Sequence, residues 1–185
     1  MHRNNIKIAA KLLLLLCITV TAFAFTEPKQ WQTFESKECK FKINFPGEAT
    51  HTSQPVATAA GELKLDIFQF DGSADTSNNN LVYMVNYSVL PDSVNSSRKD
   101  LMDLFFEGSI NGMATNIKGT VLSQTKADYK GYPGREVRYD LQGQATITVK
   151  LILIENRYYI LMAITAVNKE PNPDIKKFFD SFENE

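Results

Sequence analysis

The chain has 185 residues, of which 43% are hydrophobic, 11% aromatic and 22% charged. This composition is typical of a folded globular protein, excludes disordered and collagen-like proteins, and at this length fits one domain. Twenty basic residues balance 21 acidic ones, and the formal net charge of −1 argues against a general nucleic-acid-binding protein.

Residues 1–24 have the three parts of a secretory signal peptide. The segment begins with basic residues, continues through an apolar run over residues 12–20, and ends in Ala22-Phe23-Ala24, a cleavage signature with small residues at its two key positions. The apolar run is shorter than the roughly 20 residues of a membrane span, although an uncleaved anchor stays open as an alternative. Cys17 lies inside the run, so we interpret it as part of the run and not as a lipidation site.

The predicted mature chain, residues 25–185, forms one domain. Removing the signal peptide takes away three positive charges and changes the formal net charge from −1 to −4. No further segment is long and apolar enough to span a bilayer. Cys39 is the sole cysteine after residue 24, so no internal disulfide is possible. We expect an exported protein, periplasmic or extracellular, with no transmembrane segment in the mature chain.

The first half of the mature chain predicts four strands, at 31–35, 39–45, about 62–70 and 81–90. Apolar residues alternate with polar ones in these segments, which is the period of a half-buried strand. In the third strand, for example, Leu63, Leu65 and Ile67 share one face. The polar stretches at 48–60 and 71–80 are expected to be loops.

Two helices and four more strands are predicted after Pro91, which ends the fourth strand. The segments are a helix at about 97–115, a weak strand at 119–128, strong strands at 135–141, 145–154 and 157–166, and a closing helix from Pro173. Leu101, Leu104 and Phe105 are expected on the buried face of the first helix. Phe178, Phe179 and Phe182 form an aromatic stripe on the closing one.

The segment 145–154 changes character along its length. Residues 145–150 alternate, whereas 151–154 are apolar on both faces, as is the next strand, 157–166. Strands of that kind lie in the middle of a sheet that is covered on both sides. We therefore predict an α+β fold, a mainly antiparallel sheet with helices on both faces (an α/β/α sandwich).

A register for the preceding hairpin also follows from the pattern. Pairing Val137 with Val149, and Tyr139 with Ile147, keeps the apolar faces together. The same register sets Glu136 opposite Lys150, a favourable cross-strand pair of charges.

In the order of these features the chain resembles the Mog1/PsbP-like superfamily, particularly its small exported bacterial members. The resemblance rests on KFKINFPGE (40–48), the mid-chain helix, GYPGREVRY (131–139), the hairpin TITVKLILIENRYYILMAITA (146–166) and FFDSFE (178–183). It covers nearly all of 31–183. It implies an antiparallel sheet between helices and a role as an accessory or protein-binding factor, without identifying a partner.

Few residues offer catalytic or metal-binding chemistry. Cys39 and His51 are the sole cysteine and histidine after residue 24, but no flanking signature supports a nucleophile pair, so we expect none. Zinc sites draw several ligands from histidine, cysteine and carboxylate, and too few are present. The run 71–82 lacks the glycine and glutamate of an EF-hand. No metal and no cofactor are therefore expected.

One small cluster is a candidate binding site. Tyr132, Arg135 and Arg138 follow one another near the GYPG turn and could hold an anionic group, with Arg135 making a bidentate contact. The alternative is an aromatic residue of a loop beside solvated arginines.

The fold pattern contains no recognised catalytic constellation, so we do not expect an enzyme. The leading hypothesis is an exported, non-catalytic binding or accessory protein, whose protein or small-molecule partner the sequence does not identify. The alternatives are a small-molecule or lipid carrier with an apolar pocket, and a carboxylate-based hydrolase. A closed apolar cavity would favour the carrier. A cleft with paired carboxylates would favour the hydrolase, and a shallow surface would favour the accessory protein.

Cleavage is expected after Ala24, which leaves Phe25 as the first residue of the exported protein. N-terminal sequencing of the exported protein tests this. A mature chain that begins at a lipidated Cys17 would contradict it.

Overall fold

The structure, a computed structural model, describes residues 30–58, 61–170 and 172–185. The predicted signal peptide, its cleavage site and Cys17 lie outside the described residues. Within those residues, no helix is both long enough and apolar enough to cross a membrane.

Ten strands form two antiparallel sheets in the part of the chain that the structure describes. The small sheet has the order β1 (Gln32–Ser36), β2 (Phe41–Phe45), β10 (Glu183–Asn184). The large sheet has the order β3 (Thr50–Thr58), β4 (Gly61–Asp71), β5 (Asn80–Val89), β9 (Arg157–Ala166), β8 (Ala145–Ile154), β7 (Gly134–Leu141), β6 (Thr120–Lys126). The helices are α2 (Lys99–Ile117) and α3 (Pro173–Asp180).

The predicted register between β7 and β8 is confirmed. Val137 pairs with Val149, Tyr139 with Ile147, and Glu136 with Lys150. β8 and β9 continue this meander as a hairpin at the centre of the large sheet. Keeping apolar side chains on a shared face excludes a slip of one residue, which would turn every side chain to the other face.

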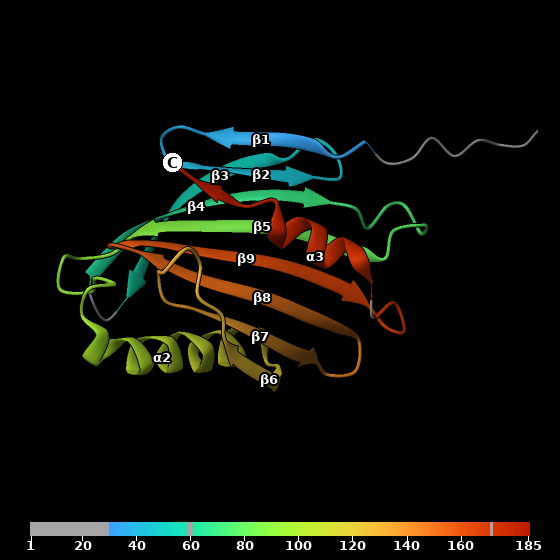
Figure 1. Cartoon of the computed structure of the whole chain (residues 1–185). Coiled ribbons are helices and arrows are strands. Elements are labelled where there is room, and N and C mark those ends of the chain that lie inside the picture. Colours follow the sequence, from blue (N-terminus) through green and yellow to red (C-terminus); the bar gives the residue numbers. More distant parts are fainter. Residues whose placement is uncertain (1–29, 59–60, 171) are drawn as a thin grey trace, which may run out of the picture.

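Two apolar cores lie on opposite faces of the large sheet. On one face, β4, β5, β9 and the end of β8 pack against the small sheet and α3, with Phe41, Phe45 and Phe178 fully buried between them. On the other face, β7, β8 and β9 pack against α2 through Phe106 and Ile110. Figure 1 shows the small sheet beside β3–β5 and α2 beside β6–β8.

The predicted α/β/α sandwich is wrong. The described residues hold two helices, of 19 and 8 residues, and the second face of the large sheet is covered mainly by another sheet. The physical reason is that α3 has only two turns and covers little of the apolar surface on that face. The alternating residues of β2 supply the rest of the cover, because Phe41, Ile43 and Phe45 all point into the core.

Two further expectations are corrected. The stretch 48–60, expected to be a loop, contains β3, an edge strand that pairs only with β4 and is exposed on both faces, so it carries no alternation. Leu104, expected in the core, is 71% exposed. The buried stripe of α2 consists of Met102, Phe106 and Ile110, because the helix has apolar residues on several sides and the sheet selects one of them.

The two covers are offset from each other across the large sheet. The small sheet and α3 leave the polar part of β8, together with β7 and β6, uncovered on their side. On the opposite side, α2 leaves β3, β4 and part of β5 uncovered. Each face of the sheet therefore has one covered half and one open half.

Phe178→Ala should destabilise the protein strongly. The ring is fully buried, with its centroid 5.4 Å from that of Phe45 and 5.1 Å from that of Tyr83. Truncating such a side chain costs about 3–5 kcal/mol, which corresponds to a drop in Tm of about 6–20 °C for a domain of this size. Differential scanning calorimetry measures it. Leu104→Ala is the matched control and should change stability by less than about 0.5 kcal/mol; equal effects of the two variants would contradict the packing described.

Candidate functional site

A groove of about 690 Å³ lies between α3 and the strands β7 and β8. Its floor is the open half of the sheet on the α3 side, where Glu136 and Arg138 project from β7, and Thr148 and Lys150 from β8. Two residues farther along β8, Ile152 is buried in the apolar core. The groove therefore lies where the cover of the sheet ends. At the same place, β8 changes from apolar to polar side chains on that face.

Charges of both signs line the groove. Arg138 forms an ion pair with Glu170, and Lys176 forms one with Asp180 on the next turn of α3. Glu136 and Lys150 are direct neighbours across β7 and β8, but neither forms an ion pair among the described residues. The predicted register is thus present without the predicted ion pair.

Thr148 contributes a buried hydroxyl group to the groove. The residue is only 4% exposed, and its hydroxyl oxygen has no hydrogen-bond partner in the described part of the chain. A buried hydroxyl without a partner destabilises the folded state by about 1–3 kcal/mol. Unpartnered polar atoms of this kind call for an explanation.

The three residues of the predicted anion site do not form one site. Arg138 lines the groove on the α3 side of β7. Arg135, three residues earlier, lies on the opposite face under α2. Tyr132 precedes β7, pairs through its backbone with Tyr129, and packs against the core on the α3 side. Whether any of them binds an anion stays a prediction.

Arg135 has a structural environment. The residue is 9% exposed, its guanidinium lies 4.8 Å from the centre of the Phe106 ring, and it forms an ion pair with Asp103 of α2. Lys126 of β6 binds the same carboxylate at 3.0 Å. The hydrogen bond from Lys126, supported by the charge of Arg135, lowers the pKa of Asp103. Arg135 thus joins α2 to β6 and β7.

Cys39 and His51 have different surroundings. Cys39 is 1% exposed, and burial raises the pKa of its thiol, which disfavours the nucleophilic thiolate. His51 stacks on Phe68, with 4.3 Å between the ring centroids, and its Nε2 lies 3.0 Å from Oδ1 of Asp66. Over the described residues no group of three histidine, cysteine or carboxylate side chains could hold a metal ion.

Asp66 is a buried carboxylate held by His51 and Lys64. It is 2% exposed, and Lys64 lies 3.3 Å from Oδ2, on the side away from His51. Burial by itself would raise the pKa of Asp66, but the hydrogen bonds with His51 and Lys64 outweigh burial and lower the pKa. The contact between His51 and Asp66 fastens the beginning of β3 to β4.

The other open half of the sheet is apolar. Leu63, Leu65 and Ile67 project from β4 toward the α2 side, next to Val56 of β3, and all four are half-buried. None of them belongs to either core. Sequence alternation places the three β4 residues on one face, but nothing in the pattern shows where the cover of that face stops.

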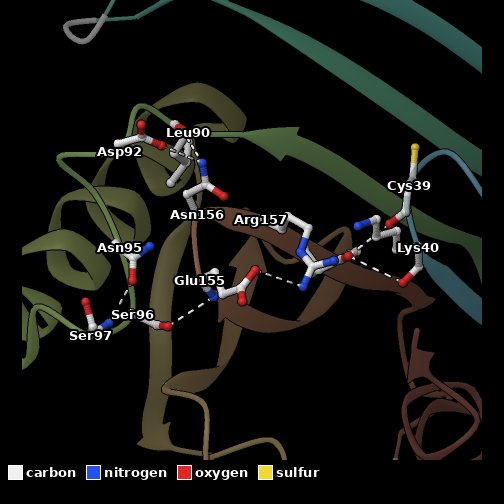
Figure 2. Close-up of polar contacts among 11 residues, drawn as sticks. Cys39, Lys40, Leu90, Asp92, Asn95, Ser96, Ser97, Glu155, Asn156 and Arg157 are labelled. Carbon is white, nitrogen blue, oxygen red and sulfur yellow. Dashed lines mark hydrogen bonds and ion pairs between the residues drawn. The ribbon is translucent and has the colours of Figure 1, made fainter.

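Polar contacts at the turn between β8 and β9 fix the start of α2. In Figure 2 this turn lies against the loop that leads into α2. The backbone carbonyl of Asn156 accepts a hydrogen bond from the amide of Leu90 at 2.8 Å, and the side-chain amide of Asn156 donates to the carbonyl of Leu90 at 3.1 Å. Ser96 and Glu155 exchange two more hydrogen bonds, of 2.8 and 3.0 Å. These bonds set where α2 begins and therefore which part of the sheet it leaves open.

The comparisons with known proteins bear on the fold. The solution structure of cyanobacterial PsbP (CyanoP) from Synechocystis sp. PCC 6803 matches with a TM-score of 0.59 and 9% identity, over 90% of this chain and 99% of that one. The fold is PsbP-like. At this identity the match supports the PsbP-like fold and says nothing of function. It confirms the PsbP-like part of the sequence resemblance.

A second solved structure, a Pseudomonas aeruginosa protein of unknown function described as a putative regulator (PA94), has a TM-score of 0.34 at 10% identity. It covers 78% of this chain and 89% of that chain, and the score is too low to support an argument. No family model and no curated protein matches the chain.

Acid should destabilise the protein partly through Asp66. Because its pKa is lowered in the folded state, the ionised carboxylate stabilises the fold above its unfolded pKa, near 3.9, and this contribution is lost as the pH falls through the folded pKa. The unfolding free energy of the wild type should therefore fall more steeply than that of Asp66→Asn between about pH 4 and pH 2. Urea denaturation at several pH values measures both slopes, and identical slopes would contradict the assignment.

Proposed function

We propose that this protein is an exported, non-catalytic accessory protein that docks onto a protein partner. The docking surface is the open apolar face of β3, β4 and β5 on the α2 side of the sheet. Export, to the periplasm or the extracellular space, is supported by the signal-peptide pattern of residues 1–24. The PsbP-like fold is compatible with such a role.

The observation that carries the proposal is an apolar surface without a cover. Val56, Leu63, Leu65 and Ile67 occupy neighbouring positions on β3 and β4, and Val82 lies on the same face of β5, opposite Asp71; all five are half-buried and belong to neither core. Contiguous apolar surface that no other element of the protein covers often marks a binding site. In Figure 1, α2 lies beside β6 and β7, which are the strands farthest from β3 and β4 in the order of the sheet.

The surroundings of this apolar face specify the partner's chemistry. Several side chains that flank it on the same face of the sheet are uncharged, namely Thr52 and Gln54 on β3, Gln69 on β4 and Asn86 on β5, whereas the exposed carboxylate of Asp71 lies at its edge, opposite Val82. The side-chain oxygen of Asn86 is buried and has no hydrogen-bond partner in the described part of the chain. A partner with a mainly apolar surface would complement this face.

The alternative functions receive less support. Four hollows hold between 210 and 690 Å³, and charged or amide side chains contribute to the lining of each, which does not suit the apolar ligand of a carrier. A hydrolase would need two facing carboxylates. In the groove beside α3, Glu170 and Asp180 are each held by a cation.

Site-specific photo-crosslinking tests the docking surface. A photoreactive phenylalanine analogue at position 65, in the exported protein in its native host, should give one discrete crosslinked protein. An excess of purified, unmodified protein should compete for it. The same analogue at position 122 is the matched control, because Leu122 is an exposed leucine on β6. It should give no such product.

Substitutions provide a second readout. With the analogue moved to position 63, on the same face of β4, Leu65→Ser should reduce recovery of the crosslinked partner at least several-fold, while Leu122→Ser should leave it unchanged, because only Leu65 lies on the apolar face. Circular dichroism confirms that both variants are folded. Equal crosslinking from positions 65 and 122, or none from position 65, would contradict the proposal.

A further inference from the structure

The groove beside α3 is a second candidate site, separate from the proposed docking surface. It carries three cations and three carboxylates: Arg138, Lys150 and Lys176, and Glu136, Glu170 and Asp180. Because the two signs alternate over a short distance, an anion or a cation placed in the groove meets repulsion as well as attraction. The groove therefore favours a ligand without net charge.

Two of these charges are free to bind a neutral group. Glu136 and Lys150 lie directly opposite each other across β7 and β8, and neither has an ion-pair partner within the described ranges. A hydroxyl group both donates and accepts hydrogen bonds. One ligand hydroxyl can thus donate to the carboxylate of Glu136 and accept from the ammonium of Lys150, and both of these bonds are charge-assisted.

Thr148 adds an independent indication of a ligand. It is 4% exposed, it belongs to the lining of the groove, and its hydroxyl is unpartnered in the described part of the protein. A protein that bound nothing here would be at least as stable with valine at this position, because valine has the same shape and no polar atom to satisfy. A ligand hydroxyl would supply the missing hydrogen bond.

The wall formed by α3 is partly apolar. Ile175 and Phe179 lie on the groove side of the helix, opposite the polar floor. A ligand that fits has apolar C–H surface on one side and hydroxyl groups on the other. The volume, about 690 Å³, lies within the range of small-molecule sites.

We infer that this groove binds a neutral oligosaccharide. The sugar hydroxyls bind Glu136, Lys150 and Thr148, and the C–H face of a sugar ring packs on Ile175 and Phe179. The site has no part in the docking of a protein partner on the opposite face of the sheet. The two proposals can therefore fail separately.

The test is a titration of the isotope-labelled, purified exported protein with maltotriose, cellotriose, xylotriose and tri-N-acetylchitotriose at millimolar concentrations. At least one of these neutral probes should shift the backbone amide signals of residues 136, 148, 150 and 175–179. Calorimetry on the same probe gives the affinity. Thr148→Val should weaken binding about two- to tenfold, the effect of losing one neutral hydrogen bond, and should leave Tm unchanged or raised.

The matched control is Thr146→Val, the same change on the same strand and the same face of β8, outside the groove. It should leave the affinity unchanged. The inference is overturned if none of the four probes binds or if Thr148→Val binds as tightly as the wild type. It is also overturned if the groove binds glycine betaine or inorganic phosphate and no saccharide.

Discussion

The hairpin of β8 and β9 imposes the constraint on which the rest of the structure depends. Residues 151–154 of β8, and the middle of β9, are apolar on both faces, so both faces need a cover. The described chain has one long helix, α2, and it covers one face. The other face is covered by the small sheet, and α3 closes its side. The central strands are therefore covered on both faces, whereas the strands toward each edge of the large sheet are covered on one face at most.

The offset of the two covers explains why the open halves differ in chemistry. On the α3 side the open strands carry charges and hydroxyls, such as Glu136 and Thr148, which water can solvate or a polar ligand can bind. On the α2 side the open strands carry leucine, isoleucine and valine, such as Leu65 and Ile67, which water does not solvate favourably. The apolar strands on the α2 side therefore suit a partner with an apolar surface, and the polar strands on the α3 side suit a small polar ligand.

Most of the buried polar side chains in the part of the chain that the structure describes have hydrogen-bond partners within the protein, but a few do not. Asp66 is held by His51 and Lys64, and Thr165 donates to Asn80 at 2.6 Å, so these buried groups stabilise the fold. Three buried side-chain atoms of the described residues have no hydrogen-bond partner: the Thr148 hydroxyl, the Asn86 side-chain oxygen and Nε of Arg157. The first two lie on the open halves of the sheet, which supports a binding role for both surfaces, whereas Arg157 lies at the turn between β8 and β9.

The sequence by itself determined the strands that alternate, the register of β7 with β8, the aromatic face of α3 and the PsbP-like order of elements, because each depends on a local period or on cross-strand matching. It did not reveal β3, whose residues are solvated on both faces, or which side of α2 would be buried, because that helix has apolar residues on several sides. Only the tertiary structure separated Arg135 from Arg138 and left Leu65 without a cover. The reason is that the extent of a covering layer depends on how distant elements pack, and the alternation of residues along a single strand contains no information about it.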